Sequence, residues 1–406
     1  MAEAMALREP DRVPVMCQLA IGHYFLHAGL DPAGIWFTSD GFAEALVTLQ
    51  RRYRFDGILV NLPGRDPAWE RHVARQEREP GATRFWWKQG GFTIVPDHDN
   101  PHRFGPGGAR TAPRFRDVDP AQLVYVEPWD VGGIAYPYRW GFDAELRPAE
   151  DFFPAYHFDA IREVRRRAGD SVSVHSEVFS PFSQFVELLT VQQALLALHQ
   201  DAGKVRACLD ALAAGTIALA RRQAACGVDA ILISSAFAGA GLIGRRHYAD
   251  LVLPCERRVI AAVRQAAPEL PVYTHTCGSI GDRLDLMLET GTCGIDTLDP
   301  PPLGTVVLEE AKPLLQGRAF IKGNLDPVHT LLEGSEADVR RAVLNRLAVG
   351  GPGGGYILSS ACSVAPATPP ERLEMLTPLA EQHGRYPFPT GGRREGQAGL
   401  APAERG

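Results

Sequence analysis

A histidine and two cysteines are the residues of this chain whose types and spacing best suit chemistry. His275 and Cys277 stand two positions apart at the end of the apolar run Pro271–Thr274, and Cys362 follows a second apolar run, Tyr356–Leu358. Residues two apart on an extended chain point to the same face, so His275 and Cys277 could share one metal ion. Because zinc prefers thiolate and imidazole ligands, the pattern predicts zinc bound by His275, Cys277 and Cys362. A His-x-Cys pair also arises by chance, and packing in a core is the alternative.

Three protein ligands would leave the fourth position of a tetrahedral zinc ion open, which is typical of catalytic sites. Glu177, inside the β-rich stretch Ser171–Phe179, is the candidate for a displaceable fourth ligand and a catalytic residue. Asp56 and Asp296 are further candidates, either as acid–base groups or as capping and mouth-lining residues. Zinc deprotonates a bound thiol, and the thiolate can attack a methyl group held by a good leaving group. The site would therefore suit a thiol substrate.

The elements that must position these residues alternate between strands and helices. Eight runs are candidate strands: Val13–Ile21, Phe55–Leu62, Ser171–Phe179, Asp229–Phe237, Pro271–Cys277, Gly294–Leu298, Ala319–Leu325 and Tyr356–Ser360. Helical patterns between or after them include Ala202–Cys226, Arg245–Ala267, Gly281–Thr290, Leu308–Leu315, Ala337–Ala348 and Pro369–Gln382. Apolar strands separated by helices indicate a parallel sheet buried on both faces. Eight such units predict an α/β fold, the (β/α)₈ TIM barrel, whose active sites lie at the carboxyl ends of the strands.

One long segment interrupts the alternation. Residues 63–170 separate the second and third candidate strands and contain a predicted β-hairpin, Thr83–Lys88 with Phe92–Val95. The rest of this insertion has little periodicity. Long irregular loops in compact domains are usually functional, so we expect the insertion to lie over the barrel mouth. The expected organisation is one barrel domain at residues 1–390 and a disordered tail at 391–406.

Composition and charge exclude several classes of protein. The chain has 406 residues, 45% of them hydrophobic, a net charge of −6 and a pI near 6.1. It therefore has no basic footprint for nucleic acid or for an anionic membrane surface. No apolar stretch approaches the roughly 18 residues that span a bilayer. The first residues lack the features of a signal peptide, so we expect a cytoplasmic protein, and in a reducing cytosol cysteines outside the site should be buried thiols.

Other patterns have structural interpretations. Residues 239–244 fit G-x-G-x-x-G, but no acidic residue follows in a strand at the distance that dinucleotide binding requires, so we interpret them as a loop. His23 and His27 are four apart and could share a helical face. Without further ligands for a metal, packing is favoured for both. Trp86 and Trp87 either shape a pocket for an aromatic methyl ether or pack the insertion onto the barrel.

Three longer motifs resemble the uroporphyrinogen decarboxylase superfamily. They are THTCGSIGDRLDLMLETG from Thr274, FIKGNLDPVHTLLEGS from Phe320 and GPGGGYILSSACSVAPATPPERLEML from Gly351. Weaker similarity extends over the earlier strands. The resemblance implies a (β/α)₈ barrel and one of two activities, which are decarboxylation of tetrapyrroles and methyl transfer with corrinoid proteins.

The details of the resemblance favour the methyltransferase branch. That branch is similar in having a His-x-Cys pair, here His275 and Cys277, and a cysteine after the last strand, here Cys362, as zinc ligands. A G-N-x-x-P element is matched by GNLDP, which makes Asn324 a candidate catalytic residue. The decarboxylases have an arginine-rich motif where this chain reads CQLAIGHYFLHAG, an aspartate where it has Asn61, and a histidine where it has Cys362.

The resemblance implies that a methyl group moves between methylcobalamin on a separate corrinoid protein and a small molecule. The corrinoid would come from a partner, because the chain lacks the Asp-x-His-x-x-Gly signature. The small molecule is either an acceptor such as a thiol or a donor such as a methyl ether, and a homodimer is left open.

Two other classes of function remain open. One is a decarboxylase of a tetrapyrrole or other polycarboxylate, for which Arg139, Arg245 and Arg246 could bind carboxylates. The other is a non-catalytic protein that uses zinc to capture a thiol metabolite.

Overall fold

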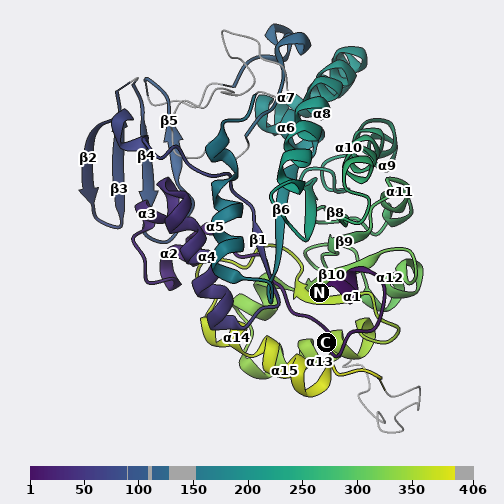
Figure 1. The fold of residues 1–406 in the computed structure, drawn as a ribbon. Coiled ribbons are helices and arrows are strands. Elements are labelled where there is room, and N and C mark those ends of the chain that lie inside the picture. The colour runs from purple at the N-terminus through teal and green to yellow at the C-terminus, as the bar shows by residue number, and fades with distance from the viewer. Residues whose placement is uncertain (89, 108–111, 128–151, 389–406) are drawn as a thin grey trace, which may run out of the picture.

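The central sheet has seven parallel strands and curls upon itself. A computed structural model describes residues 1–88, 90–107, 112–127 and 152–388. The strand order is β1-β6-β7-β8-β9-β10-β11 (Figure 1). The strands are β1 (Gly57–Val60), β6 (Ser173–Phe179), β7 (Ala230–Ser234), β8 (Val272–His275), β9 (Gly294–Thr297), β10 (Phe320–Leu325) and β11 (Tyr356–Ser360). Seven of the eight candidate strands are thus confirmed.

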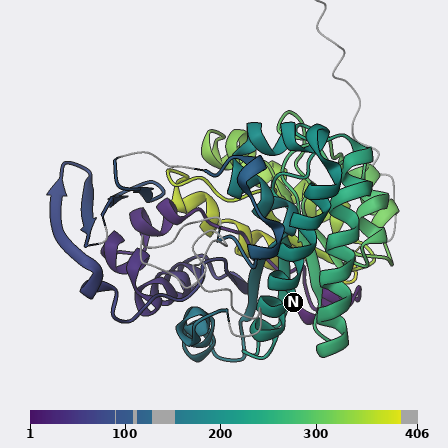
Figure 2. The ribbon, with the colours of Figure 1, turned by 90° about the horizontal axis from the view of Figure 1, so that it is seen from above.

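Helices follow the strands and surround the sheet, as the view from above shows (Figure 2). They are α4 (Ser39–Tyr53), α5 (Asp159–Ala168), α6 (Pro181–Leu189), α7 (Val191–Gln200), α8 (Ala202–Ala224), α9 (Arg245–His247), α10 (Leu253–Ala266), α11 (Leu284–Glu289), α12 (Leu308–Leu315), α13 (Glu336–Gly350), α14 (Pro370–Glu374) and α15 (Leu376–His383). The predicted helix 245–267 is divided by a π-helical turn, η8 (Tyr248–Val252). Ser335 begins α13 with a capping box.

The prediction of a strand at Val13–Ile21 was wrong. The segment makes only isolated bridges, Val15 with Leu358 and Leu19 with Val364, and Ile21 already begins helix α2 (Ile21–His27). A proline at position 14 cannot donate to a ladder, which limits regular pairing. The segment still lies between the two edges of the sheet, because the carbonyl of Val15 accepts from the N–H of Asp56 just before β1, at 2.8 Å.

The interior of the sheet is apolar at its amino-terminal end. A buried cluster there takes inward side chains from five strands and one from the N-terminal segment, namely Leu59, Ala230, Leu232, Tyr273, Phe320, Ile357 and Met16. Ala4 and Met5 of helix α1 (Ala2–Met5) complete this cluster. Strand residues that alternate with these, such as Ile58 and Ile231, pack outward in the larger cluster under the helices.

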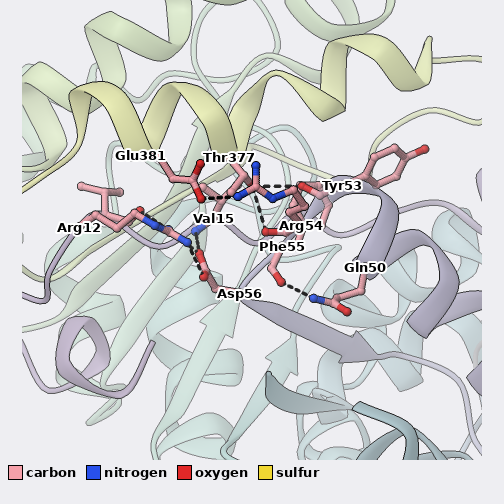
Figure 3. A network of polar contacts seen from close by, with 10 residues as sticks. Arg12, Val15, Gln50, Tyr53, Arg54, Phe55, Asp56, Thr377 and Glu381 are labelled. Atoms are coloured by element: carbon pink, nitrogen blue, oxygen red, sulfur yellow. Dashed lines mark hydrogen bonds and ion pairs between the residues drawn. The ribbon is translucent and has the colours of Figure 1, made fainter. Parts of the chain in front are cut away.

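Asp56 holds the N-terminal segment to the start of β1 (Figure 3). Its carboxylate accepts two hydrogen bonds of 2.8 Å from Arg12 and one of 2.7 Å from the backbone N–H of Val15. Close by, the Thr377 hydroxyl donates to the carbonyl of Tyr53 at 3.1 Å (Figure 3). Asp56 precedes its strand and so lies at the end of the sheet opposite the carboxyl ends, which supports its capping role over an acid–base role.

The insertion after β1 contains a second, antiparallel sheet. Its strands are β2 (Val73–Glu79), β3 (Ala82–Trp87), β4 (Phe92–Pro96) and β5 (His102–Phe104), in that order. At the place of the expected hairpin, β3 and β4 pair antiparallel, from Ala82 with Pro96 to Trp86 with Phe92. The sheet lies to one side of the barrel beside helix α3 (Pro32–Phe37), as Figures 1 and 2 agree.

Aromatic packing joins this sheet to α3. Phe37 stacks on Trp69 with ring centroids 4.6 Å apart and meets Phe85 and Trp87 at 4.7 and 5.6 Å. Trp87 is buried, and its indole N–H donates to Thr93 at 3.0 Å, so Trp87 has the packing role. The remaining short helices are the 3₁₀ turns η1 (Trp69–His72), η2 (Phe115–Asp117), η3 (Pro120–Gln122) and η7 (Ala155–Phe158) and the π-helix η9 (Pro327–Leu332).

Parts of two predictions fall on residues 128–151 and 389–406, outside the described residues. They are the middle of the insertion, with Arg139, and the tail at 391–406. Across the described ranges, none of the helices has the length and apolar character needed to cross a membrane.

Candidate metal centre

The carboxyl ends of β8 and β11 bring the three predicted ligands together. His275 is the last residue of β8, Cys277 follows it by two positions, and Cys362 follows the end of β11 by two. The ligand atoms of the three residues all lie within 4.8 Å of one another. No other cluster of histidine, cysteine or acidic side chains suited to a metal occurs among the described residues. The fold thus brings together the three residues that the sequence pattern singled out.

The distances between the donor atoms fit a zinc ion. Nε2 of His275 is 3.2 Å from Sγ of Cys277, which is 3.6 Å from Sγ of Cys362. Tetrahedral zinc, with bonds of about 2.3 Å to sulfur and about 2.0 Å to nitrogen, separates two sulfurs by about 3.8 Å and nitrogen from sulfur by about 3.5 Å. The sulfurs are too far apart for a disulfide, whose S–S bond is about 2.05 Å. Spacing and donor types therefore both suit zinc.

Asp296 fixes the orientation of the His275 ring. Its carboxylate lies 3.1 Å from Nδ1 of His275 and 3.0 Å from Nζ of Lys322, and all three side chains are buried. Burial opposes charge on Asp296, but Lys322 and His275 lower the pKa of this carboxyl below its usual value. An ionised Asp296 accepts the Nδ1 proton, which leaves Nε2 for a metal.

The protonation of the three donors is coupled. Burial lowers the pKa of His275, but its hydrogen bonds with Asp296 and Cys362 outweigh burial and raise the pKa to about 10. Hydrogen bonds from Cys277 and His275 lower the pKa of Cys362 well below that of a free thiol, while the same contact with Cys362 raises the pKa of Cys277. A bound dication would displace the protons that His275 and Cys277 keep.

Backbone contacts hold the loop that carries Cys277. The N–H of Gly278 donates to the carboxylate of Asp299 at 2.6 Å, and Gly278 adopts a φ of +75°, which favours glycine. On the other side, Gly239 packs so closely that a Cβ there would lie 2.4 Å from the carbonyl oxygen of Cys277. The position of Cys277 is therefore set by two neighbouring loops as well as by β8.

Glu177 lies near the three ligands but is not one of the clustered donors. Val174 and Val178 of β6 point outward into the cluster under the helices, as does Ile231 of the neighbouring β7. Because side chains alternate along a strand, Glu177 points to the inner face of the sheet. It is buried, and burial raises the pKa of its carboxyl to about 7. Its Oε2 has no hydrogen-bond partner among the described residues. Its role as a displaceable fourth ligand stays a prediction.

Asn324 occupies the end of β10 and is fully buried. Its side-chain nitrogen donates to the carbonyl of Leu298 at 2.8 Å. Its Oδ1 finds no partner in the part of the chain that the structure describes. The residue thus ties the ends of β9 and β10 together and leaves one acceptor available, so its catalytic role also stays a prediction.

Sequence reasoning missed Lys322 and the anchoring role of Asp299. A lysine inside the otherwise apolar run FIKGNL is a signal that could have indicated a buried ion pair. Of the arginines considered for carboxylate binding, Arg245 forms an ion pair with Asp285 at 2.5 Å. The side chain of Arg246 is 92% exposed.

Comparison with known proteins places the chain in a family. The model of the family described as uroporphyrinogen decarboxylase (URO-D) matches residues 142–383, which is more than half of the chain. The chain belongs to the URO-D family. This confirms the resemblance, and the matched region contains Glu177, His275, Cys277, Asp296, Asn324 and Cys362.

Relatives within the URO-D family have two different names. A uroporphyrinogen decarboxylase of Saccharopolyspora erythraea is 35% identical over 186 residues, 45% of this chain and 50% of the relative. A methylcobamide:CoM methyltransferase, MtbA, of Methanosarcina acetivorans is 27% identical over 234 residues, 55% of this chain and 62% of the relative. The alignments thus span about half to two thirds of these relatives.

A solved structure supports the fold assignment. A methyltransferase from Methanosarcina mazei superposes with a TM-score of 0.65, and the alignment covers 94% of this chain and 97% of that one. The two sequences are 16% identical, so the likeness concerns the fold.

Proposed function

We propose that this URO-D family protein is a zinc-dependent methyltransferase. It would move a methyl group between a corrinoid protein, which supplies the methylcobalamin cofactor, and a small molecule such as a thiol or a methyl ether. The observation that carries the proposal is the buried cluster of His275, Cys277 and Cys362, whose donor types and spacings suit zinc. Relatives named methylcobamide:CoM methyltransferases support the choice of reaction.

The chain's own residues would prepare the centre. His275 and the two cysteines would hold zinc, which when bound favours the thiolate form of a thiol or polarises an ether oxygen. Asp296 would keep His275 in the tautomer that presents Nε2, and Lys322 would keep Asp296 ionised. These two buried groups would restrict the His275 ring without contacting the substrate.

Glu177 would serve as the proton-handling group or the fourth ligand. A carboxyl with a pKa of about 7 can both hold and release a proton at neutral pH. Its unpartnered Oε2 leaves one oxygen for such an exchange among the described residues. Asn324, with its own available Oδ1, would orient a bound group from the neighbouring strand.

The proposal is tested by anaerobic assay of zinc-loaded protein with methylcobalamin and small thiols, and with reduced cobalamin and methyl ethers. The absorbance of the corrinoid reports methyl transfer in either direction. We expect turnover by the wild type and its loss in Cys277→Ser and Cys362→Ser, while Cys226→Ser keeps the wild-type rate. A folded, zinc-loaded wild type that transfers no methyl group in either direction would overturn the proposal.

Decarboxylation is the second candidate because other relatives are named uroporphyrinogen decarboxylases, including one that is 28% identical over 257 residues. It predicts that metal-free protein releases carbon dioxide from uroporphyrinogen. Arg12, whose guanidinium donates to Asp56 and to the carbonyl of Val13 at the opposite end of the sheet, cannot serve such a substrate at the metal centre. Product analysis by chromatography separates the two candidates.

We further infer that the fold is a complete (β/α)₈ barrel in which the segment 13–19 takes the eighth strand position. Hydrogen bonds on both sides support this inference: the N–H of Leu358 in β11 donates to the carbonyl of Pro14 at 2.9 Å, and the carbonyl of Val15 accepts from Asp56. Residues 1–390 would then form one barrel domain with an insertion at residues 63–170.

A further inference from the structure

A partly enclosed cavity lies beside the metal centre and has a defined chemical character. Its volume is about 150 Å³, and its walls come from the N-terminal segment, α2, α3, the end of β1, the insertion and the loop after β11. Ser363, which follows Cys362 in the chain, lines it. Asn61 lines both this cavity and a smaller one of about 20 Å³ that Glu177 lines. The cavity is thus next to the residues of the proposed reaction.

The size and walls of the cavity suit an aromatic ring. An apolar cavity of roughly this volume accommodates benzene. Leu19, Ile21, Tyr24, Trp36 and Leu62 supply apolar and aromatic surface, and aromatic rings pack favourably edge-to-face or offset against one another.

Two buried polar atoms of the lining residues lack partners. Oε1 of Gln18 and Nε1 of Trp36 each expose less than 1 Å², and neither has a hydrogen-bond partner among the described residues. An unsatisfied buried acceptor and donor are costly. After a rotation of each side chain toward the cavity, a ligand hydroxyl could donate to Gln18 and a ligand oxygen could accept from Trp36, which would satisfy both.

The charges around the cavity disfavour an ionic ligand. None of its lining residues, within the part of the chain that is described, has an acidic or basic side chain, so an anion would lose its water without a charged partner. A cation is disfavoured by Arg65, whose buried guanidinium already lies 5.3 Å from the centre of the Trp36 ring. An uncharged ring is the remaining choice.

We propose that this cavity binds the uncharged ring of a phenol or phenyl methyl ether as the small-molecule substrate of the metal centre. The inference rests on the proposed methyltransferase function and names the substrate class for it. A thiol that carries a negative charge is not the expected substrate, because its charge would lie against the uncharged side chains of Gln18, Trp36 and Asn61.

Ligand binding to the full, zinc-loaded chain tests this proposal without any corrinoid. Ligand-observed NMR titrations would compare 2-methoxyphenol, methoxybenzene, benzoate and phenyltrimethylammonium. We expect 2-methoxyphenol to bind at one saturable site, and benzoate and the ammonium compound to bind at least about tenfold more weakly. The proposal is overturned if folded wild type does not bind 2-methoxyphenol or binds either charged ring as tightly.

Two substitutions locate the site. Ala20→Phe places a ring in the cavity and should weaken the binding of 2-methoxyphenol by about tenfold or more. Leu26→Phe, at a 43% exposed position of α2, should leave this affinity unchanged. The wild type should bind 2-methoxyphenol about three- to tenfold more tightly than methoxybenzene, and Gln18→Leu should remove this preference. If Ala20→Phe does not fold, the Gln18→Leu result decides, and an unchanged preference contradicts the proposal.

The binding result and the methyl-transfer result can fail separately. Methyl transfer to or from a non-aromatic substrate, without phenol binding, would defeat this inference and keep the methyltransferase. Phenol binding that depends on Ala20 and Gln18, without methyl transfer by the zinc-loaded protein, would keep the cavity assignment and defeat the reaction.

Discussion

At the scale of single residues, the metal centre depends on how one histidine is held. Nδ1 of His275 faces Asp296 at 3.1 Å, and its Nε2 faces Cys277 at 3.2 Å. Lys322 supplies the positive charge that keeps Asp296 ionised inside the barrel. Carboxylates behind metal-binding histidines fix the ring and increase its basicity, so Asp296 should matter for zinc binding although it does not contact zinc.

Replacing Asp296 should weaken zinc binding while the three ligands stay in place. Asp296→Asn is expected to lower zinc affinity about 10- to 100-fold, measured by competition with a chromophoric chelator. Asp285→Asn is the matched control, because Asp285 pairs with Arg245 on the surface. Equal zinc affinity for Asp296→Asn and wild type would refute the orienting role.

The proximity of the three candidate ligands was predictable from the sequence, but the residues that support them were not. His275, Cys277 and Cys362 stand at the ends of strongly apolar strands, and parallel strands bring such ends together. Lys322 and Asp296 became partners only through the register of β9 and β10, in which they are paired residues. The two residues are 26 positions apart in the chain, and the prediction of the two strands did not include the register that pairs them.

At the scale of elements, the loop after β7 sets the position of the loop after β8. The N–H of Ser235 donates to the carbonyl of His275 at 2.7 Å, and Gly239 packs against the carbonyl of Cys277. Behind this loop, the buried Glu256 of α10 accepts hydrogen bonds from Ser235 and, at 2.9 Å, from Tyr248.

A single methyl group added to the loop after β7 should disturb the metal centre. Gly239→Ala places a Cβ 2.4 Å from the carbonyl oxygen of Cys277, so the Cys277 loop must shift and zinc affinity should fall by about tenfold or more. Gly241→Ala is the control, because its Cβ would meet nothing within 4 Å. Chelator competition on both variants measures the difference, and equal affinities would show that the contact is unimportant.

Glu256 should make stability depend on pH. Burial raises the pKa of Glu256 to about 7 in the folded protein, whereas an unfolded chain releases this proton near pH 4.3. The contribution of Glu256 to the free energy of unfolding is therefore complete at acidic pH. It is lost as the pH rises through 7, by an amount on the order of 3 kcal/mol.

The Glu256→Gln variant isolates this contribution, because glutamine cannot ionise. Its free energy of unfolding, from urea denaturation, should be near that of wild type at pH 5 and should exceed it at pH 8.5. The exposed Glu289→Gln serves as the control. A difference between Glu256→Gln and wild type that does not change with pH would contradict the assignment.

Elements with long apolar patterns were predicted well, and the first strand was not. Tyr356–Ser360 and Leu308–Leu315 have the predicted bounds. Periodicity alone does not separate a short apolar strand from a buried helix, and in the run 13–21 the chain changes from extended backbone to helix α2 at Ile21. Gly57–Val60 is likewise shorter than its predicted strand because each end meets a loop.

At the scale of the whole molecule, the interior of the curled sheet changes from apolar to polar along the strands. Leu59, Phe320 and Ile357 fill the amino-terminal end with α1. Lys322 and Asp296 follow toward the carboxyl ends, where the ligands lie. The apolar end stabilises the fold, while the polar end positions the chemistry, as expected for this architecture.

Closure of the barrel should depend on the contacts of Asp56. Asp56→Ala removes two hydrogen bonds with Arg12 and one with Val15, and it should lower the free energy of unfolding by about 1–3 kcal/mol. Glu381→Gln, at the partly exposed ion pair with Arg54, should cost less than about 1 kcal/mol. Urea denaturation measures both, and equal losses would contradict a closing role for Asp56.

The most direct test of the central claim is the zinc content of the purified full chain, measured by elemental mass spectrometry. The account predicts about one zinc per chain in wild type, little or none in Cys277→Ser and Cys362→Ser, and a wild-type amount in Cys293→Ser, whose thiol lies outside the cluster. A folded wild type that binds no zinc even when purified anaerobically with added metal would contradict the proposed zinc centre and favour decarboxylation as the function.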